Sequence, residues 1–193
     1  MDEINEADAV LDSELQRYLK ECFLYEPDTG RFWWRHRPLS HFETSGMAAS
    51  WNTRWAGTEA FVSRVGKNKA YLAGRVTIDG EYVKMLAHVA AWIYVYGVRP
   101  LSQIDHKNTI KSDNRIDNLR QATQTENNWN QTKRKASPYP KGVYKPRDKK
   151  RFVAQAVLGG KNTFLGYFDT PDEAHAAWLK AVTPERGDFL RVA

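Results

Sequence analysis

Apolar residues recur at helical spacing near the start of the chain. One stripe of an α-helix would hold Leu11, Leu15, Tyr18, Leu19 and Cys22. This period predicts an amphipathic helix that serves packing and ends near residue 23. Ser13 and Gln16 have the spacing of a capping box, which places the first turn of the helix at SELQ.

Short runs in which apolar and polar residues alternate follow the turn EPDTG. They read RFWWRH, RWAGTEAFVSRV and GRVTIDGEYV, and they predict short antiparallel strands. Asp79-Gly80 between two such segments is typical of a tight hairpin. The next stretch, MLAHVAAWIYVYG, predicts a second helix that ends at Gly97. We interpret His88 on this helix as a packed core histidine, with a ligand role as the alternative.

The pattern then changes to strand, polar loop, strand and helix within about thirty residues. The segments are LSQIDH, KNTIKSDNRID, NLRQAT and TENNWNQTKRK. Thr125 is the predicted N-cap of the helix. Adjacent side chains of a strand point to opposite faces, so a bend after LSQIDH is needed if Asp105 and His106 are to reach one site.

The last third of the chain predicts a small sheet backed by one helix. Alternating runs RFVAQAVL and NTFLGYF flank Gly159-Gly160, which predicts a hairpin, and GVYK can add a third short strand. Thr170 is the predicted N-cap of the helix that follows. Its buried stripe is expected to hold Ala174, Ala177, Trp178 and Ala181. A single helix leaves the opposite face of the sheet uncovered.

These elements predict an α+β protein in three parts. Residues 1–23 form the N-terminal helix, and residues 24–135 form a β-rich region followed by the strand, loop, strand and helix segment. Residues 136–193 form the three-stranded antiparallel sheet with its helix. A Pro-bearing linker, KASPYP, lies at the second boundary.

Composition and charge narrow the class of protein. The chain has 193 residues, 41% of them hydrophobic, which is enough to bury a core. Its one cysteine excludes both a disulfide framework and a thiolate zinc site within the chain. Its acidic start differs from a signal peptide, and its apolar runs fall short of the roughly 18 residues of a membrane span. We therefore expect a soluble protein of the cytoplasm that has no membrane partner.

The formal net charge of +6 is unevenly distributed. Residues 1–30 carry a net charge of −7, whereas residues 133–193 carry thirteen basic and six acidic side chains. Nine of the nineteen residues from Lys133 to Arg151 are basic. Such a density attracts a polyanion across a Debye length of roughly 8–10 Å. A solvated face or linker is the alternative interpretation.

The pair Asp105-His106, followed by asparagines, has the chemistry for hydrolysis of a phosphodiester. Carboxylate and amide oxygens are ligands that Mg²⁺ accepts, and an imidazole can take a proton from water at neutral pH. A metal would neutralise charge on the phosphate while His106 activates the attacking water. The pattern implies neither a serine nor a cysteine nucleophile.

Residues 86–131, LAHVAAWIYVYGVRPLSQIDHKNTIKSDNRIDNLRQATQTENNWNQ, resemble the HNH endonucleases of the kind carried by bacteriophages and mobile introns. The shared pattern is His, an apolar helix, Asp-His, Asn-Arg-x-x-Asn-Leu, then Thr and Glu-Asn. The resemblance implies a ββα-metal fold. It assigns His106 as general base, Asp105 and Asn127 as metal ligands, and Asn118 as the residue that pins the loop and orients the histidine.

Asn130 is the rival of Asn127, because residues three apart share one face of a helix. Many relatives carry histidine at the helix position, and here no histidine lies between His106 and His175. This departure favours Mg²⁺, with Mn²⁺ as the other option, over zinc or nickel.

The final segment resembles the plant Apetala/ethylene-response-factor DNA-binding domain, which also occurs fused to HNH nucleases. Gly142-Val143, RFVAQA, LGYFDTPDEAHAAW and RGDFLRV carry the resemblance. In that family the sheet enters the major groove of duplex DNA. The basic and polar residues expected to contact DNA here are Lys141, Lys145, Arg147, Lys149, Lys150, Arg151, Gln155 and Lys161. Gln155 could pair with adenine or face solvent, and Phe152 replaces the usual tryptophan.

The sequence thus predicts a metal-dependent DNA endonuclease of the homing type with a C-terminal recognition module. Double-stranded DNA is the expected partner, a divalent metal is the expected cofactor without any small organic one, and the chain is expected to be a monomer or weak dimer in a bacterial or phage-infected cell. A DNA-binding regulator that uses the nuclease fold only as a scaffold is the alternative. An RNA-acting nuclease is a third option.

Overall fold

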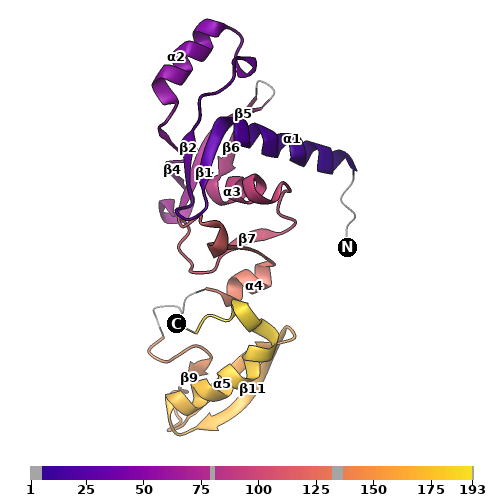
Figure 1. Cartoon of the computed structure of the whole chain (residues 1–193). Coiled ribbons are helices and arrows are strands. Elements are labelled where there is room, and N and C mark those ends of the chain that lie inside the picture. Colours follow the sequence, from indigo (N-terminus) through magenta and orange to yellow (C-terminus); the bar gives the residue numbers. More distant parts are fainter. Residues whose placement is uncertain (1–5, 79–80, 132–136, 193) are drawn as a thin grey trace. The chain divides into compact units, whose positions relative to one another are not determined.

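The computed structural model describes residues 6–78, 81–131 and 137–192. The chain divides into two compact units, Met1–Ala122 and Thr123–Ala193, each a mixture of helices and small antiparallel sheets (Figure 1). The division precedes the helix of the predicted nuclease segment, whereas the sequence-based boundary lies at residue 135. The two units are described separately below.

The first unit begins with helix α1, Glu6–Cys22. Leu15, Leu19 and Cys22 of the predicted stripe are buried, Tyr18 packs against the core, and the side chain of Leu11 is outside the description. The start of the helix was predicted wrongly. Ser13 lies well inside α1, because the helical period continues upstream of the local capping signal.

Helix α1 leads directly into strand β1, Phe23–Glu26, which pairs with β2, Arg31–Trp34. Strand β3, Glu59–Ala60, completes this sheet beside β2. Its core is aromatic, since Phe23, Phe32 and Phe61 are all buried and their rings contact one another.

Between β2 and β3 the chain forms a 3-10 turn, η1 (Leu39–His41), and helix α2, Ser45–Trp55. The strand predicted over RWAGTEAFVSRV is therefore wrong in its first part, which ends α2. Thr44 caps α2 by accepting a hydrogen bond from the N–H of Met47. The side chain of Asn52 bonds both the N–H and the C=O of Arg37, and these contacts from outside the helix attach α2 to the unit.

A second sheet contains β4 (Ser63–Val65), β5 (Tyr71–Ile78) and β6 (Glu81–Leu86), with the 3-10 turn η2 (Lys67–Lys69) after β4. The predicted hairpin is confirmed, because β5 and β6 pair in antiparallel register up to Ile78 and Glu81. Asp79 and Gly80 lie outside the described residues.

Helix α3, Ala87–Tyr96, follows β6 and ends at Gly97, whose φ of 73° is left-handed. This confirms the predicted stop signal. Ala87, Ala90, Ala91 and Ile93 are buried in the core that α3 shares with α1 and the first sheet, and His88 is buried with them. Strands β7 (Gln103–His106) and β8 (Leu119–Ala122) then form an antiparallel pair, joined by a loop that ends in the 3-10 turn η3 (Ile116–Asn118).

The second unit begins with helix α4, Gln124–Trp129. Thr123 caps it, not the predicted Thr125, because Glu126 stands three residues after Thr123 and completes a reciprocal capping box.

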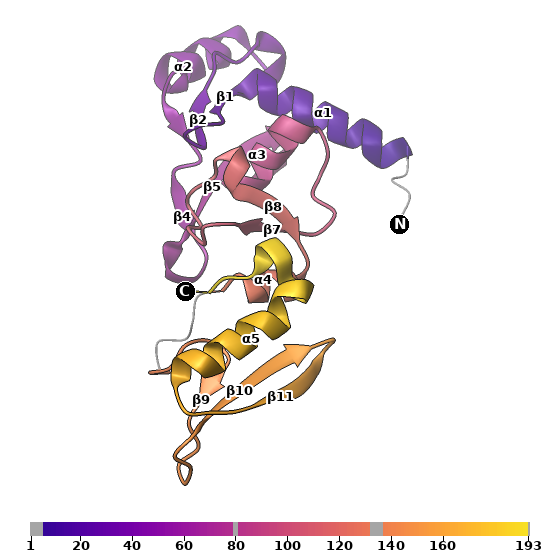
Figure 2. The same cartoon turned by 60° about the horizontal axis from the view of Figure 1, so that its bottom comes forward.

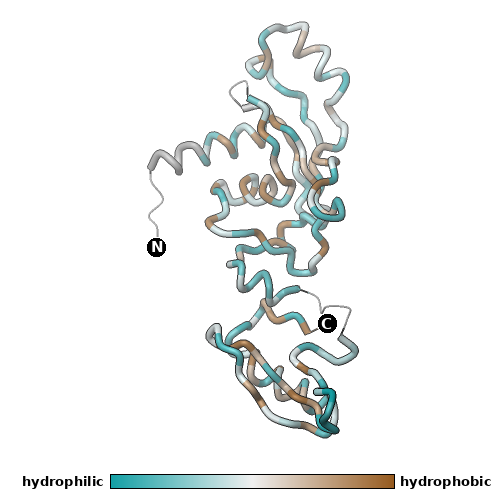
Figure 3. The backbone as a smooth tube through the Cα atoms, turned by 180° about the vertical axis from the view of Figure 1, so that it is seen from behind, coloured by the Kyte–Doolittle hydropathy of each residue, from teal (hydrophilic) through white to brown (hydrophobic). Residues whose placement is uncertain are grey.

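The three-stranded sheet of this unit has the order β11-β10-β9, and helix α5 (Pro171–Arg186) packs along one face (Figure 2). The strands are β9 (Val143–Tyr144), β10 (Phe152–Leu158) and β11 (Lys161–Phe168), and the 3-10 turn η4 (Gly187–Phe189) follows α5. Figure 3 shows hydrophobic stretches along these strands beside hydrophilic connections at their ends.

Thr170 caps α5 as predicted, in a capping box with Glu173. Ala174, Trp178 and Val182 are the buried residues of the helix, so Ala177 and Ala181 lie nearer the edge of the stripe than expected. In the described parts of the chain, none of the helices is both long enough and apolar enough to cross a bilayer.

Candidate active site

The site of interest lies where β7 ends and its loop begins. Asp105 stands opposite Arg120 on β8, and His106 stands opposite Leu119. The chain turns at once, because the N–H of Thr109 donates to the carbonyl of His106 and Thr109 has a left-handed φ of 65°. The chain therefore bends directly after β7, and the side chains of both Asp105 and His106 are buried.

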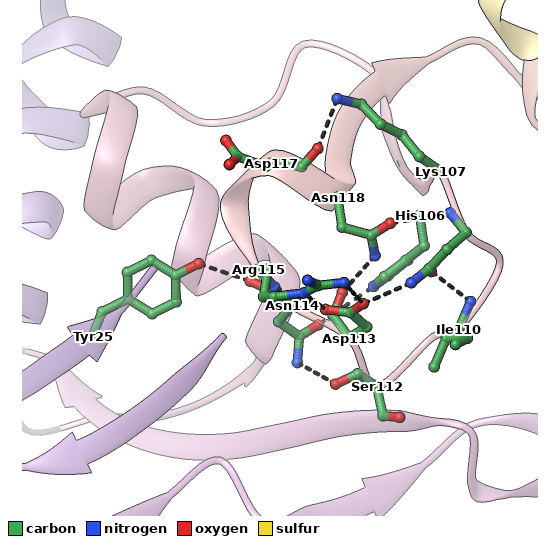
Figure 4. Close-up of polar contacts among 11 residues, drawn as sticks. Tyr25, His106, Lys107, Ile110, Ser112, Asp113, Asn114, Arg115, Asp117 and Asn118 are labelled. Atoms are coloured by element: carbon green, nitrogen blue, oxygen red, sulfur yellow. Dashed lines mark hydrogen bonds and ion pairs between the residues drawn. The ribbon is translucent and has the colours of Figure 1, made fainter. Parts of the chain in front are cut away.

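Asn118 closes the loop between the two strands (Figure 4). Its side-chain oxygen accepts the N–H of Asn108 at 3.0 Å, and its side-chain nitrogen donates to the carbonyl of Asp113 at 2.8 Å. Its own carbonyl accepts the N–H of Lys107 at 2.8 Å. One buried asparagine therefore holds the start, the middle and the end of the loop together.

Asp113 forms a second centre of contacts in the loop. Arg115 donates to both of its carboxylate oxygens, at 2.8 and 2.7 Å, and the side chain of Asn108 donates at 2.6 Å. The hydrogen bonds from Arg115 are the main reason that the pKa of Asp113 is lowered to about 2. The carboxylate is therefore ionised at neutral pH and keeps the loop in one conformation.

Asn114 contacts the imidazole of His106, and although it begins the pattern Asn-Arg-x-x-Asn-Leu, no role was predicted for it from the sequence. Its Oδ1 lies 3.4 Å from Nε2 of His106, while its Nδ2 donates to the carbonyl of Ser112. An amide oxygen only accepts, so Nε2 carries the proton and Nδ1 of His106 holds the lone pair. The side chain of Asn114 is buried, and Tyr25 donates from its hydroxyl to the Asn114 carbonyl at 2.7 Å.

His106 has no exposed surface and lies among aromatic rings. The centroid of the His88 ring is 5.1 Å away in an edge-to-face arrangement, and that of Tyr71 is 6.2 Å away. Burial lowers the pKa of His106, with a smaller opposing effect from Asn114. Burial also lowers the pKa of His88, to about 3. Both imidazoles are therefore neutral at pH 7, and His106 is in the protonation state of a base.

Asp105 is compensated by two cations. Arg120 donates to its Oδ2 from Nε at 3.0 Å and from Nη2 at 2.8 Å, and Nζ of Lys111 lies 4.0 Å from Oδ1. The carboxylate is 1% exposed, so its charge would be costly without such partners.

The donor set decides which metal these residues suit. In the described residues, no group of three or more His, Cys, Asp or Glu side chains is gathered as it would be around a metal ion. A site here would use one carboxylate, Asp105, with amide and water oxygens. Mg²⁺ is often bound in this way, because it keeps several waters. The residues therefore fit a hard divalent cation, and Arg120 competes with it for Asp105.

The turn between β1 and β2 supports the loop from outside. Gly30 has a φ of 70°, and a Cβ at this position would overlap the main chain of Asn114 and Arg115. Together with the hydroxyl of Tyr25, this close approach fixes the backbone of Asn114. The sequence signal was the turn EPDTG, whose glycine was assigned only to the turn itself.

The remaining predicted ligand lies in the second unit. Asn127 is half-buried on α4, Asn130 is the buried C-cap residue of that helix, and Asn128 is exposed. The structure thus brings Asp105, His106 and Asn118 together within the first unit. The part of Asn127 or Asn130 in a metal site stays a prediction.

The predicted DNA-contacting residues belong to the second unit. The exposed ones are Lys145, Arg147, Lys149, Lys150, Arg151 and Lys161, while Gln155 is partly exposed. Arg151 forms an ion pair with Asp169 at 2.8 Å but remains at the surface. Lys141 differs, because its ammonium donates to the carbonyl groups of Gln131 and Arg191 and burial lowers its pKa. It is therefore a structural contact within its unit.

A family model described as HNH endonuclease matches residues 85–129, from the end of β6 to α4. The matched range contains Asp105, His106, Asn118 and Asn127. It supports a nuclease of the HNH kind, for which DNA is the implied substrate and a divalent metal the general requirement. A search of curated proteins finds none that matches the chain.

Proposed function

We propose that this chain is a metal-dependent HNH endonuclease of the phage and mobile-intron type, which hydrolyses phosphodiester bonds of duplex DNA. The observation that carries the proposal is the state of His106. Its Nε2 proton is directed at Asn114, its Nδ1 holds the lone pair, and burial keeps the ring neutral. A neutral, oriented imidazole beside a carboxylate is what a general base for water attack requires.

In the proposed reaction His106 removes a proton from water through Nδ1 as the water oxygen bonds to phosphorus. The bond from phosphorus to the leaving oxygen then breaks, that oxygen takes a proton from solvent, and His106 releases its proton to solvent. Asn114 holds the neutral imidazole in the required tautomer before the attack and accepts from Nε2–H of the imidazolium that forms, and Asn118 keeps the loop closed around it.

Asp105 and Asn127 would hold the divalent cation, with Asn130 as the alternative helix ligand. Mg²⁺ is the first choice and Mn²⁺ the second, because the ligands offer hard oxygens. When bound, the metal supplies charge neutralisation at the phosphate and at the leaving oxygen. Arg120 and Lys111 neutralise Asp105 in the absence of the metal.

The complete burial of His106 adds a requirement. Water and a phosphate reach its imidazole only when part of its cover moves aside. The proposed enzyme therefore opens around β7 and its loop when DNA binds.

The second unit is proposed to anchor the enzyme on duplex DNA. Its sheet is covered by α5 on one face, and exposed lysine and arginine side chains occur at the connections between its strands. A single site of this kind makes one cut, so a monomer would nick and a dimer could cut both strands.

The test is cleavage of a supercoiled plasmid in Mg²⁺ by the wild type, His106→Ala and Asp105→Ala. We expect nicking that EDTA abolishes and that both variants lose, with DNA binding retained by His106→Ala. His36→Ala is the matched control, because His36 is an exposed histidine outside the site, and it should cleave normally. Robust cleavage by both site variants would refute the assignment.

A non-cleaving DNA-binding regulator is the second candidate, and the burial of His106 favours it. This candidate predicts tight binding to duplex DNA without cleavage in either Mg²⁺ or Mn²⁺. Competition between duplex DNA and RNA in the same binding assay tests the third option, an RNA-acting nuclease.

A further inference from the structure

The face of the β9–β10–β11 sheet that α5 leaves uncovered is aromatic. Ala154 and Ala156 of β10 are buried in the clusters that contain α5 residues, so Gln155 and Val157 between them point to the other face. The register extends this outer face across three strands, with Tyr144 opposite Val153 and Val153 opposite Tyr167.

A β-bulge sets which residue of β11 joins this face. The partner of Ala154 is Gly166, but the partner of Gln155 is Phe164, so Leu165 is the extra residue. Leu165 packs in the core with α5, and Phe164 is turned to the outer face beside Gln155. Without the bulge these two side chains would exchange faces. The ring of Phe164 lies 5.2 Å from that of Tyr167.

The side chains of this outer face are uncharged, and apart from the buried Val153 they are at least partly accessible. Tyr144 is 46% exposed, Phe164 57% and Tyr167 49%. With Gln155, Val157 and Asn162 they form what we name the aromatic face. The bulge is what turns Phe164 outward.

Positive charge lies at the two ends of the strands and not on the aromatic face. Lys145, Arg147, Lys149 and Lys150 occupy the connection before β10, and Lys161 follows the turn after it. The seven residues of β10 span roughly 20 Å at about 3.3 Å per residue. Two basic ends with an apolar centre suit two rows of phosphates with base edges between them, which is the arrangement of a DNA groove.

We propose that the aromatic face reads A·T base pairs in the major groove, by contact with thymine methyl groups and by hydrogen bonds from Gln155 to adenine. This inference rests on the proposed function, in which the sheet binds duplex DNA, and it adds which base pairs the sheet prefers. Thymine alone presents a methyl group in the major groove, and adenine N6 and N7 suit the amide of Gln or Asn. Guanine is usually read by Arg or Lys, and the six residues of the aromatic face include neither.

The geometry around Gln155 supports this assignment. Strand β9 has only two residues, and beyond it the N–H of Gln155 donates to the carbonyl of Gly142 while the carbonyl of Val157 accepts from Arg186. A hollow of about 420 Å³ lies beside this edge of β10, lined by Tyr144, Gln155, Val157 and Asn162 of the aromatic face and also by Trp178 and Arg186 of α5. Among the described residues the side-chain amide of Gln155 forms no hydrogen bond, and it can therefore engage a base edge at the hollow.

The test measures binding of the full chain in EDTA to three duplexes of two helical turns at one salt concentration. The probes are alternating dA·dT, the same duplex with deoxyuridine in place of thymidine, and alternating dG·dC. Uracil differs from thymine only by the missing methyl group. Each buried methyl should change Kd about 4-fold, so two or three contacts predict a loss of roughly 15- to 60-fold. The dG·dC duplex should bind at least as weakly as the uracil duplex.

Two variants assign the effect to residues. Phe164→Ala should weaken binding to the thymine duplex and reduce the difference between the thymine and uracil duplexes. Gln155→Ala should bind normal and 7-deazaadenine duplexes equally, because the N7 acceptor is then no longer used. Tyr82→Ala is the control, since Tyr82 is an aromatic residue of the first unit that is 80% exposed, and it should behave as the wild type.

Equal binding of all three duplexes by a protein that still cleaves plasmid would overturn this inference and leave the proposed function intact. Tighter binding to single-stranded oligothymidylate than to the dA·dT duplex would also overturn it, in favour of base stacking on the aromatic face. Failure to bind or cleave any duplex would overturn the proposed function itself.

Discussion

Asn114 holds the imidazole of His106 in one tautomer, with 3.4 Å between its Oδ1 and Nε2 of the ring. Asn114 is itself supported from two sides, because its carbonyl accepts a hydrogen bond from the hydroxyl of Tyr25 and its backbone packs against Gly30. The base of the proposed reaction is therefore oriented by a residue eight positions along the chain and by the turn between β1 and β2, which is distant in sequence but adjacent in space.

Asn114→Asp should move the pH dependence of cleavage. The new carboxylate still accepts from Nε2, but its negative charge favours the imidazolium and raises the pKa of His106. The acid limb of kcat/KM should shift to higher pH by roughly 1–2 units. Asn114→Ala should lower the rate at every pH, because the ring loses its acceptor. An acid limb at the same pH in Asn114→Asp and wild type would contradict this role.

Gly30→Ala and Gly57→Ala form a matched pair. Both glycines have left-handed φ, 70° and 80°, but a Cβ at Gly57 meets nothing within 4 Å, whereas one at Gly30 meets the main chain of Asn114 and Arg115. Gly57→Ala should cost roughly 1–2 kcal/mol of unfolding free energy from strain alone. Gly30→Ala should cost roughly 2–5 kcal/mol, since the loop must also move. Urea denaturation measures both, and equal losses would refute the packing argument.

Arg120→Met should destabilise the protein and make its stability depend on Mg²⁺. The substitution removes two donors from a carboxylate that is 1% exposed, at a cost of about 3–5 kcal/mol. A cation at Asp105 would replace the lost charge, so Mg²⁺ should raise the melting temperature of this variant more than that of the wild type. Arg17→Met, at an exposed position of α1, is the control. Identical Mg²⁺ responses would argue against metal binding at Asp105.

His88 makes the protein sensitive to acid. Its pKa is about 3 in the fold because of burial and about 6.5 when unfolded, so between these values the unfolded chain binds more protons. Stability should therefore fall as the pH falls through this window, with a slope of at most about 1.4 kcal/mol per pH unit. His88→Phe removes this titration and should flatten the slope between pH 6 and 4. Chemical denaturation across that range tests it, and parallel slopes would disprove the assignment.

The basic side chains before β10 should raise the affinity for DNA through contacts with phosphate groups. Lys149→Gln and Lys150→Gln should each lower the slope of log K against log salt concentration by roughly 0.9 if each contacts one phosphate. Sequence preference should stay the same. Lys180→Gln is the control, because Lys180 is an exposed base on α5. Unchanged slopes in both variants would place the DNA-binding surface elsewhere.

Short sequence patterns correctly predicted the elements that are determined by residues close together in the sequence. The β10–β11 hairpin follows from alternation around Gly159-Gly160, and helix α5 follows from Thr170 with Glu173 three residues on. Helix α2 was missed although Met47, Trp51 and Trp55 have helical spacing, and this stripe is not buried as a core face. Only Ala48 and Asn52 are buried in it, and Asn52 is bonded to Arg37, which lies outside the helix.

The sequence by itself determined the segments that form the candidate site. They are a strand that ends in Asp105-His106, a polar loop and a returning strand. Which asparagine of the loop faces the imidazole was decided only by the tertiary structure. Asn108, Asn114 and Asn118 are alike in sequence, but the closed loop turns Asn118 to the main chain and Asn114 to His106. The physical reason is that side-chain direction in a loop depends on its long-range supports, here Tyr25 and Gly30, which no local pattern encodes.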